Sequence, residues 1–222
     1  MSMQDKIFFD SEGDNYFNRI LNNKNWNFEN KLQNDLPLYL IKNNLNKIDS
    51  VAEVGSSTGF RLNYLIDNYQ AKADAYEPSK EAIMYGQKIY PDINFIRQTA
   101  SNIDVADNSY DLVIVDFVLC WVDRTTLFKS LSNIDRILKN KGFLAIGDFD
   151  VPTPRRRFYH HLPKSDVWTY KQEYKNIFVS SNLYNIIDEK KVCNSQLDGL
   201  PRICTLLKKD LNSNYEINNS DL

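Results

Sequence analysis

The order of hydrophobic and polar positions divides the chain into a helical N-terminal part and a longer part in which strands and helices alternate. Apolar residues recur at helical spacing in two segments of residues 14–46, and Pro37 predicts a kink or a break in the second. From residue 50 onward, short apolar runs alternate with amphipathic segments. The predicted strands are 50–54, 71–76, 94–98, 111–117 and 143–147, and the predicted helices between them are 61–69, 80–89 and 124–139.

This alternation predicts an α/β fold of the doubly wound type, in which right-handed crossovers connect a mostly parallel sheet. Gly142 is interpreted as the residue that caps the 124–139 helix. The alternation of strands and helices stops at residues 151–182. We interpret this segment as an insertion over the carboxyl ends of the strands, with a helix around 169–178. Two closing strands are expected at 185–192 and 202–207.

A length of 222 residues suits a single domain. Its expected parts are a helical cap (1–49), a cofactor-binding core (50–150), the insertion and helix (151–182), closing strands (183–209) and a flexible tail (210–222). The net charge of −2 argues against a nucleic acid partner. The three cysteines lack CxxC spacing and fit reduced thiols in a cytoplasmic protein. No secretory signal, no apolar run long enough to span a membrane and no metal-ligand pattern is seen, so we expect no metal.

The sequence VAEVGSSTGF (51–60) runs from a strand through a small-residue turn into a helix, so its backbone can approach a ligand at the helix N-terminus. Glu77 ends the next predicted strand, 22 residues after Gly55, where a carboxylate can accept hydrogen bonds from both hydroxyls of a ribose. A dinucleotide fingerprint is excluded, because Ser57 and Phe60 replace its second and third glycines. A plain strand–helix turn remains an alternative.

The same turn also fits the GxSxG nucleophile elbow of a hydrolase, with Ser57 as the nucleophile. That interpretation requires a histidine after the last strand. The only histidines, His160 and His161, fall in the insertion instead, and the turn follows the first strand. We therefore disfavour it.

Four motifs in order resemble those of the class I S-adenosylmethionine-dependent methyltransferases: VAEVGSSTG, AYEPS, the stretch NIDVADNSYDLVIVDFVLCWV and LKNKGFLAIGDF. The resemblance implies a seven-stranded Rossmann-like sheet whose last strand is antiparallel, and S-adenosylmethionine as cofactor with S-adenosylhomocysteine as product. The acid that often binds the adenine amino group in this family is replaced by Thr99. The implied cofactor-binding residues are Glu53, Gly55, Ser56, Ser57, Gly59, Glu77, Pro78, Thr99, Ala100, Asp116 and Phe117, with Tyr16 and Arg19 from the first helix.

The acceptor is expected above the carboxyl ends of the fourth and fifth strands. His160, His161 and Asp148 are the candidate catalytic groups, because an oxygen acceptor needs a base. The candidate acceptor-binding residues are Trp121, Arg157, Tyr159 and Tyr170. For each of these an ordinary role stays open, as a surface histidine pair, a solvated arginine loop or core aromatic packing.

A looser resemblance of the flanking segments to methyltransferases of surface-sugar and secondary-metabolite pathways implies a small polar acceptor, such as a sugar or nucleotide-linked sugar. The alternatives are an RNA or protein methyltransferase and a catalytically inactive cofactor-binding scaffold. The acceptor atom stays open, as does the choice between monomer and homodimer.

Overall fold

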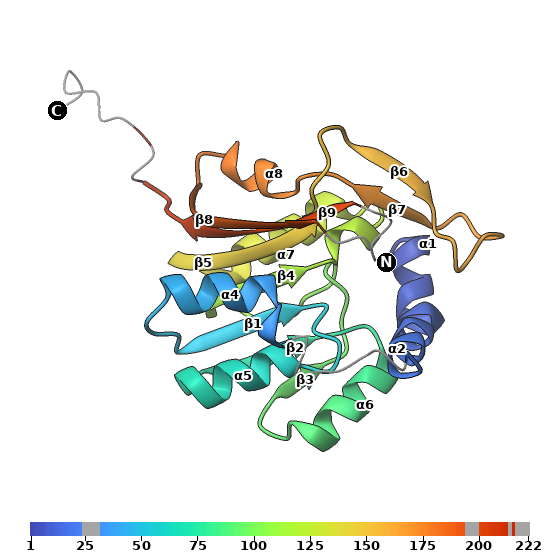
Figure 1. Cartoon of the computed structure of the whole chain (residues 1–222), viewed down its shortest axis with the longest axis horizontal. Coiled ribbons are helices and arrows are strands. Elements are labelled where there is room, and N and C mark those ends of the chain that lie inside the picture. Colours follow the sequence, from blue (N-terminus) through green and yellow to red (C-terminus); the bar gives the residue numbers. More distant parts are fainter. Residues whose placement is uncertain (24–31, 194–199, 213–214, 216–222) are drawn as a thin grey trace.

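The computed structural model describes residues 1–23, 32–193, 200–212 and 215 of the chain. Its main sheet has seven strands in the order β3-β2-β1-β4-β5-β9-β8 (Figure 1). Strand β9 runs antiparallel to both neighbours, and the other described pairs of this sheet are parallel. The strands are β1 (Ser50–Val54), β2 (Lys72–Tyr76), β3 (Asn94–Ile96), β4 (Tyr110–Asp116), β5 (Leu138–Phe149), β8 (Tyr184–Cys193) and β9 (Pro201–Lys209). The predicted sheet and its antiparallel last strand are confirmed.

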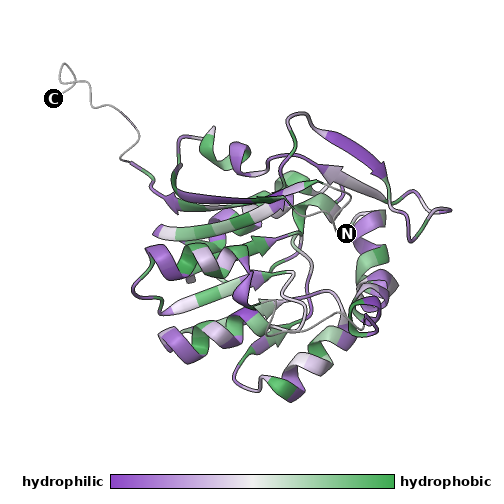
Figure 2. Ribbon diagram, viewed as in Figure 1, coloured by the Kyte–Doolittle hydropathy of each residue, from purple (hydrophilic) through white to green (hydrophobic). Residues whose placement is uncertain are grey.

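Helices cover both faces of the sheet, which explains the continuous apolar run of β4. Helices α4 (Leu36–Asn44) and α5 (Phe60–Tyr69) bury their apolar sides against one face. Helices α7 (Leu127–Ile137) and α8 (Lys175–Val179) pack on the other, and α6 (Lys80–Ile89) contacts β3 at the edge. Apolar residues accordingly concentrate in the central strands, whereas the outlying strand β6 is strongly hydrophilic (Figure 2).

Pro37 marks a helix start and produces no kink. Helix α4 begins at Leu36, and the Asp35 carboxylate caps it by accepting a hydrogen bond from the amide of Leu38 at 3.0 Å. Proline is tolerated in the first turn because its missing N–H would have no partner there. Part of the predicted 14–46 helical region, residues 24–31, lies outside the described residues.

Two predicted elements are wrong. Gly142 does not cap a helix, because α7 ends at Ile137 and the chain continues directly as β5, which pairs with β4 from Leu138 onward with a bulge. The helix expected around 169–178 is largely a strand: β7 (Trp168–Lys171) forms a hairpin with β6 (Arg155–Phe158), and only α8 is helical. Burial alternates along β7, which is the period of a strand.

The first 21 residues form what we call the N-terminal arm: α1 (Met3–Ile7), the π-helix η1 (Phe8–Glu12) and α2 (Gly13–Leu21). The arm lies along the carboxyl ends of the parallel strands (Figure 1). The buried Gln4 amide donates to the carbonyls of Trp121 and Trp168, at 2.6 and 2.9 Å, and accepts from the amide of Trp168. The arm is therefore tied to the β6–β7 hairpin and to the segment after β4.

Candidate active site

The turn after β1 uses three left-handed backbone conformations: Gly55 (φ 72°), Ser57 (φ 51°) and Gly59 (φ 80°). A side chain at Gly55 would overlap with Val118, so this position needs glycine for space as well as for conformation. Ser57 adopts the same conformation without that freedom, which costs about 1 kcal/mol. The family's middle glycine is thus replaced without a change of turn geometry.

The Glu77 carboxylate, at the end of β2, is bonded into this turn. Its two oxygens accept hydrogen bonds from the amides of Ser57 and Ser79, at 2.7 and 2.8 Å. Burial raises the pKa of Glu77 to about 7, even though both amides favour the charged form and lower it. The sequence-predicted pairing of the turn with an acid at the end of the second strand is present. Pro78 follows, and its carbonyl accepts from Arg97.

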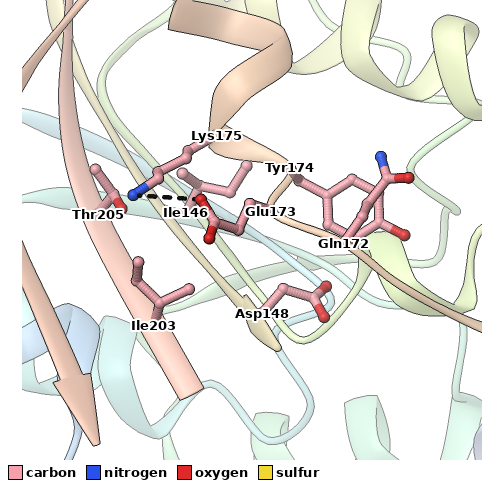
Figure 3. A pocket seen from close by; sticks show the side chains of 8 residues that line it. All are labelled: Ile146, Asp148, Gln172, Glu173, Tyr174, Lys175, Ile203 and Thr205. Carbon is pink, nitrogen blue, oxygen red and sulfur yellow. Dashed lines mark ion pairs between the residues drawn. The ribbon is translucent and has the colours of Figure 1, made fainter. Parts of the chain in front are cut away.

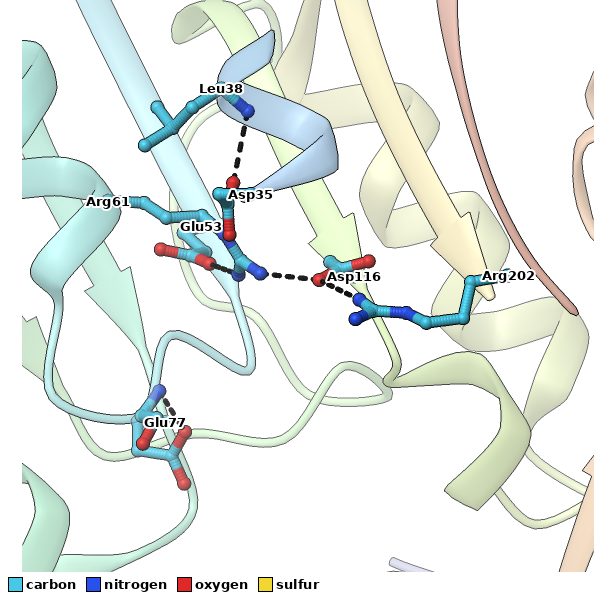
Figure 4. Close-up of polar contacts among 8 residues, drawn as sticks. Asp35, Leu38, Glu53, Arg61, Glu77, Asp116 and Arg202 are labelled. Carbon is cyan, nitrogen blue, oxygen red and sulfur yellow. Dashed lines mark hydrogen bonds and ion pairs between the residues drawn. The ribbon is translucent and has the colours of Figure 1, made fainter. Parts of the chain in front are cut away.

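A buried charge cluster lies beside the turn (Figure 4). Arg61, in the first turn of α5, donates to Asp35 at 2.8 Å, to Glu53 at 2.5 Å and also to Asp116 at the end of β4. Burial raises the pKa of Glu53 to about 7, and Arg61 only partly offsets this. Arg202 approaches the same Asp116 from the start of β9.

Sequence reasoning named Glu53 and Asp116 as cofactor-binding residues but missed Arg61, Asp35 and Arg202. The structure shows that the two named carboxylates already hold Arg61. One oxygen of each remains buried and without a hydrogen-bond partner among the described residues. The available signal for Arg61 was its place directly after the glycine turn, at the start of a helix.

Tyr16, from α2, faces the ends of the strands. Burial raises its pKa, and Cys120, Glu77 and Asp116 raise it further, whereas Arg202 lowers it. The side chain nevertheless retains 43% of its exposure. Tyr16 is therefore a partly exposed side chain within electrostatic reach of the groups at the strand ends.

Arg19, the other predicted residue of the first helix, points elsewhere. Its guanidinium pairs with the buried Glu12 and donates to the hydroxyl of Tyr159 at 2.8 Å. The Tyr159 hydroxyl in turn donates to Glu12 at 2.7 Å. Within the described residues, no contact joins Arg19 to the glycine turn. Its contacts with Glu12 and Tyr159 fasten the N-terminal arm to the hairpin.

Thr99 is buried at the position where an acid was expected. Its hydroxyl lies 3.2 Å from that of Ser101, which donates at 2.8 Å to Asp5 of the N-terminal arm. The arm thereby brings a carboxylate close to Thr99 from a distant part of the sequence. Beside them, the Ala100 carbonyl accepts from Asn133 at 2.9 Å.

The ends of β4 and β5 carry a pair of aromatic rings. Phe117 has a left-handed backbone (φ 56°), and its ring meets that of Phe149 edge-on at 5.0 Å between centroids. Asp148 directly precedes Phe149, and its carboxylate accepts from the amides of Phe149 and Cys120 at 2.8 and 3.1 Å. Burial raises the pKa of Asp148 to about 8.

Asp148 also lines a small cavity of about 10 Å³ under the segment that leads into α8 (Figure 3). Such a volume holds at most a single water molecule. Its lining is completed by Ile146, Gln172, Glu173, Tyr174, Lys175, Ile203 and Thr205. The acceptor cannot occupy this cavity.

The predicted acceptor-side residues are distributed over the hairpin and its contacts with the arm. Buried Tyr159 meets Trp121 edge-on at 4.8 Å, and His160 and His161 flank it at 5.7 and 5.3 Å. Both histidines are exposed, and burial, Arg19 and His160 lower the pKa of His161. Tyr170 lies under the guanidinium of Arg124 at 4.1 Å. Arg157 is exposed on β6.

The residues at the ends of β1 and β2 fit a bound sulfonium nucleoside. At Gly55 and Gly59 the turn carries no side chain of its own, and Glu77 offers an acceptor at the neighbouring strand end. Two further hydroxyls of the turn, Ser56 Oγ and Thr58 Oγ1, are buried and have no hydrogen-bond partner among the described residues. Orphaned buried hydroxyls at such a turn indicate a polar ligand.

Residues 52–146 match the family model described as a methyltransferase domain. A search of curated proteins finds no match to the sequence. The fold is similar to that of 1,6-didemethyltoxoflavin-N1-methyltransferase from Burkholderia thailandensis, solved with 1,6-didemethyltoxoflavin and S-adenosylhomocysteine. That protein is 13% identical, the match covers 89% of this chain and 91% of that one, and the TM-score is 0.64.

Two further structures are similar. The N-methyltransferase NodS from Bradyrhizobium japonicum WM9, in complex with S-adenosylhomocysteine, is 14% identical over 88% of this chain and 97% of that one, with a TM-score of 0.63. A S-adenosylmethionine-dependent methyltransferase from Methanosarcina mazei is 14% identical over 78% and 98%, with a TM-score of 0.64. At these identities the likeness shows a shared fold.

The family model adds a match in sequence, which a shared fold alone does not provide. It spans the strands and turns from β1 to β5, including the glycine turn and Glu77. The resemblance seen in the four sequence motifs is thereby confirmed, together with the S-adenosylmethionine cofactor that the class uses. The match of residues 52–146 and the shared fold together support a class I S-adenosylmethionine-dependent methyltransferase.

Proposed function

We propose that this methyltransferase acts on a small polar acceptor, with sugars and nucleotide-linked sugars as the first class to test. The observation that carries the proposal is the bonding of Glu77, at the end of β2, into the glycine turn at the end of β1. The N-terminal arm packs beside these strand ends, where its Asp14 accepts from Ser79 at 2.6 Å, and so covers part of the approach to them. This cover favours a small molecule over a duplex or a folded protein surface.

Two similar proteins support a small acceptor. Both are N-methyltransferases by name, and one was solved with 1,6-didemethyltoxoflavin bound. No helix among the described residues is long and apolar enough to cross a membrane. Cytoplasmic location and oligomeric state stay predictions.

The cofactor would be held by groups at the ends of four neighbouring strands, β3, β2, β1 and β4. The glycine turn, including Ser56 and Ser57, would approach it through the backbone, and Glu77 would accept from its ribose hydroxyls. Thr99 and Ala100 would lie beside the adenine ring, and Asp116, Phe117 and Tyr16 near the sulfonium end. When bound, S-adenosylmethionine supplies a methyl group on a positively charged sulfur, and the electron pair of the breaking C–S bond remains on that sulfur.

The chain's own contribution is mainly alignment. Holding the acceptor atom in line with the methyl group removes most of the entropic cost of bringing the two together. The phenol of Tyr16 is protonated near neutral pH, as for any tyrosine, and its raised pKa extends this to higher pH, so it would offer a hydrogen-bond donor. An oxygen acceptor must also lose a proton, whereas an amine needs only to arrive uncharged.

The base for an oxygen acceptor stays a prediction. Asp148, with a pKa of about 8, could accept a proton from about that pH upward, but two backbone amides already hold its carboxyl group. His160 and His161 are accessible to solvent, and their described ring contacts are with Tyr159 and with each other. Arg157, Tyr170 and Trp121 stay candidates for contacts with the acceptor.

The test combines binding and turnover. Calorimetry should show S-adenosylhomocysteine binding to the wild type and to Glu81→Gln, and much weaker binding to Glu77→Gln. Glu81 is the matched control, because it lies in the first turn of α6 and the same charge is removed. Methyl-labelled cofactor is then offered with small-molecule, RNA and protein fractions of a cell extract. Label in the small-molecule fraction is expected; label only in RNA or protein, or binding without turnover of any fraction, would contradict the proposal.

A further inference from the structure

We propose that Arg202 receives a negatively charged group of the acceptor, a carboxylate or a phosphate, beside an apolar wall formed by Phe117 and Phe149. The inference rests on the proposed function and deepens it by naming the charge of the acceptor. Arg202 carries no role in the expectations drawn from the sequence, because nothing in its surroundings along the chain distinguishes it.

Arg202 lies on the side of β4 away from the strand ends that carry the glycine turn and Glu77. It pairs with Phe149, the last residue of β5, in the antiparallel register of β5 and β9. The glycine turn and Glu77 lie beyond β4, on β1 and β2. Figure 4 shows the guanidinium reaching across the strand ends toward Asp116, on the side opposite Glu77. The fold thus separates a cofactor half from a half that contains Arg202.

The Arg202 guanidinium is held in a fixed position, but its hydrogen-bond donors lack close acceptors among the described residues. It lies over the ring of Phe117, 4.4 Å from the centroid, which fixes its plane. Its nearest carboxylate oxygen, Oδ2 of Asp116, is 3.5 Å away and already accepts from Arg61. Charge-assisted hydrogen bonds are normally about 2.7–2.9 Å. Among the residues that the structure describes, nothing accepts from the buried Nε–H of Arg202.

A purely charge-neutralising role would predict a close bond between Arg202 and Asp116. The second oxygen of Asp116 is turned toward the β5 backbone, where a side chain at Gly147 would overlap with it, so it does not face Arg202. The cluster also has its own cation in Arg61. What remains is a fixed planar fork with free donors, the arrangement that binds carboxylates and phosphates bidentately.

A second cation strengthens the positive potential at this end of the sheet. Buried Lys171, on β7, lies 4.3 Å from the ring centroid of Phe149, which itself contacts Phe117. Two rings are therefore flanked by two cations. Arg202 also lowers the pKa of Tyr16, so the guanidinium lies within electrostatic reach of that hydroxyl. An acceptor with an anionic group and a flat apolar part would match this surface.

The experiment uses protein saturated with S-adenosylhomocysteine and measures the binding of benzoate and phenyl phosphate against neutral benzamide. We expect the wild type to bind at least one anion at least tenfold more tightly than benzamide. The preferred anion distinguishes carboxylate from phosphate. In Arg202→Gln the preference should fall to less than twofold, and Arg202→Lys should retain part of it. Arg156→Gln, which removes the same charge from the outlying hairpin, should keep the wild-type preference.

Two outcomes would overturn the inference. One is equal binding of anions and benzamide by the wild type. The other is a loss of tenfold or more in S-adenosylhomocysteine affinity in Arg202→Gln, which would assign the guanidinium to the cofactor's own carboxylate. Labelling experiments separate this inference from the proposed function. Methylation of neutral small molecules alone would leave the proposed function intact and refute the inference, whereas methylation of RNA or protein alone would refute the proposed function.

Discussion

Replacing Glu77 by glutamine should weaken cofactor binding in a way that depends on pH. The pKa of Glu77 is about 7, so its charged fraction rises from about 0.1 at pH 6 to about 0.9 at pH 8. If ribose hydroxyls donate to the charged form, the affinity of the wild type for S-adenosylhomocysteine should rise about tenfold over this range. The glutamine variant should show no such rise.

The expected loss of cofactor affinity at pH 8 is that of one charged hydrogen bond to the ribose, because the glutamine side chain is already engaged by the two backbone amides. Glutamine has one oxygen, so it can satisfy Ser57 or Ser79 but presents its NH₂ group to the other. Hydrogen bonds to a charged acceptor contribute about 1.5–3 kcal/mol each. Losing one such bond to the ribose therefore weakens binding about 10- to 150-fold at pH 8.

The variant must also be shown to fold. Because the folded pKa of Glu77 lies above its ordinary value of 4.5, this group's stabilising contribution is present at low pH and is lost as the pH rises to 7. Glu77→Gln lacks that loss, so its stability relative to the wild type should improve between pH 5 and pH 8. Calorimetry at pH 6, 7 and 8 and urea unfolding at pH 5 to 8 give both quantities, with Glu81→Gln as control. Wild-type affinity that is flat between pH 6 and 8, or variant affinity within twofold of it at pH 8, would refute the reasoning.

Three other predictions concern groups around the site. Arg61→Met should reduce the free energy of unfolding by about 3–5 kcal/mol in urea at pH 7, because three buried carboxylates lose their cation; a loss below about 1 kcal/mol would contradict this. The pKa of Asp148 is about 8, so wild-type stability should fall with rising pH between about 4 and 8, and Asp148→Asn should gain on it by up to about 1.4 kcal/mol per pH unit. Parallel stability curves would show this to be wrong. Asp5→Asn should weaken the bonds from Ser101 and Thr126, at a cost of about 1–3 kcal/mol, and accelerate amide exchange in residues 1–21. Unchanged exchange there would refute a fastening role for Asp5.

The sequence was most informative where one strand or turn carries its own pattern. Strand β1 and helix α6 have the predicted bounds, because buried runs and caps such as Ser79 are local signals. The relation between Gly55 and Glu77 was also visible, since two consecutive parallel strands bring their ends together. Short segments were ambiguous: the polar stretch before Gly142 suggested a helix end but lies in a bulged strand.

Contacts between distant segments were not predictable in this way. The cluster around Arg61 joins residues before β1, within β1 and at the end of β4, and no spacing rule relates them. The same holds for Arg202, whose surroundings depend on the register of β5 with β9. The contacts of Arg19 could not be predicted without the fold either, because Glu12 and Tyr159 determine where its side chain points.

The N-terminal arm has a consequence for how the protein matures. Its buried polar side chains find partners far along the chain: Asp5 bonds Ser101, and Gln4 bonds Trp121 and Trp168, 117 and 164 residues away. The arm must therefore wait, with Gln4 and Asp5 still hydrated, until the β6–β7 hairpin has been synthesised. The contacts of the arm at the strand ends are accordingly among the last to form, although the arm precedes all its partners along the chain.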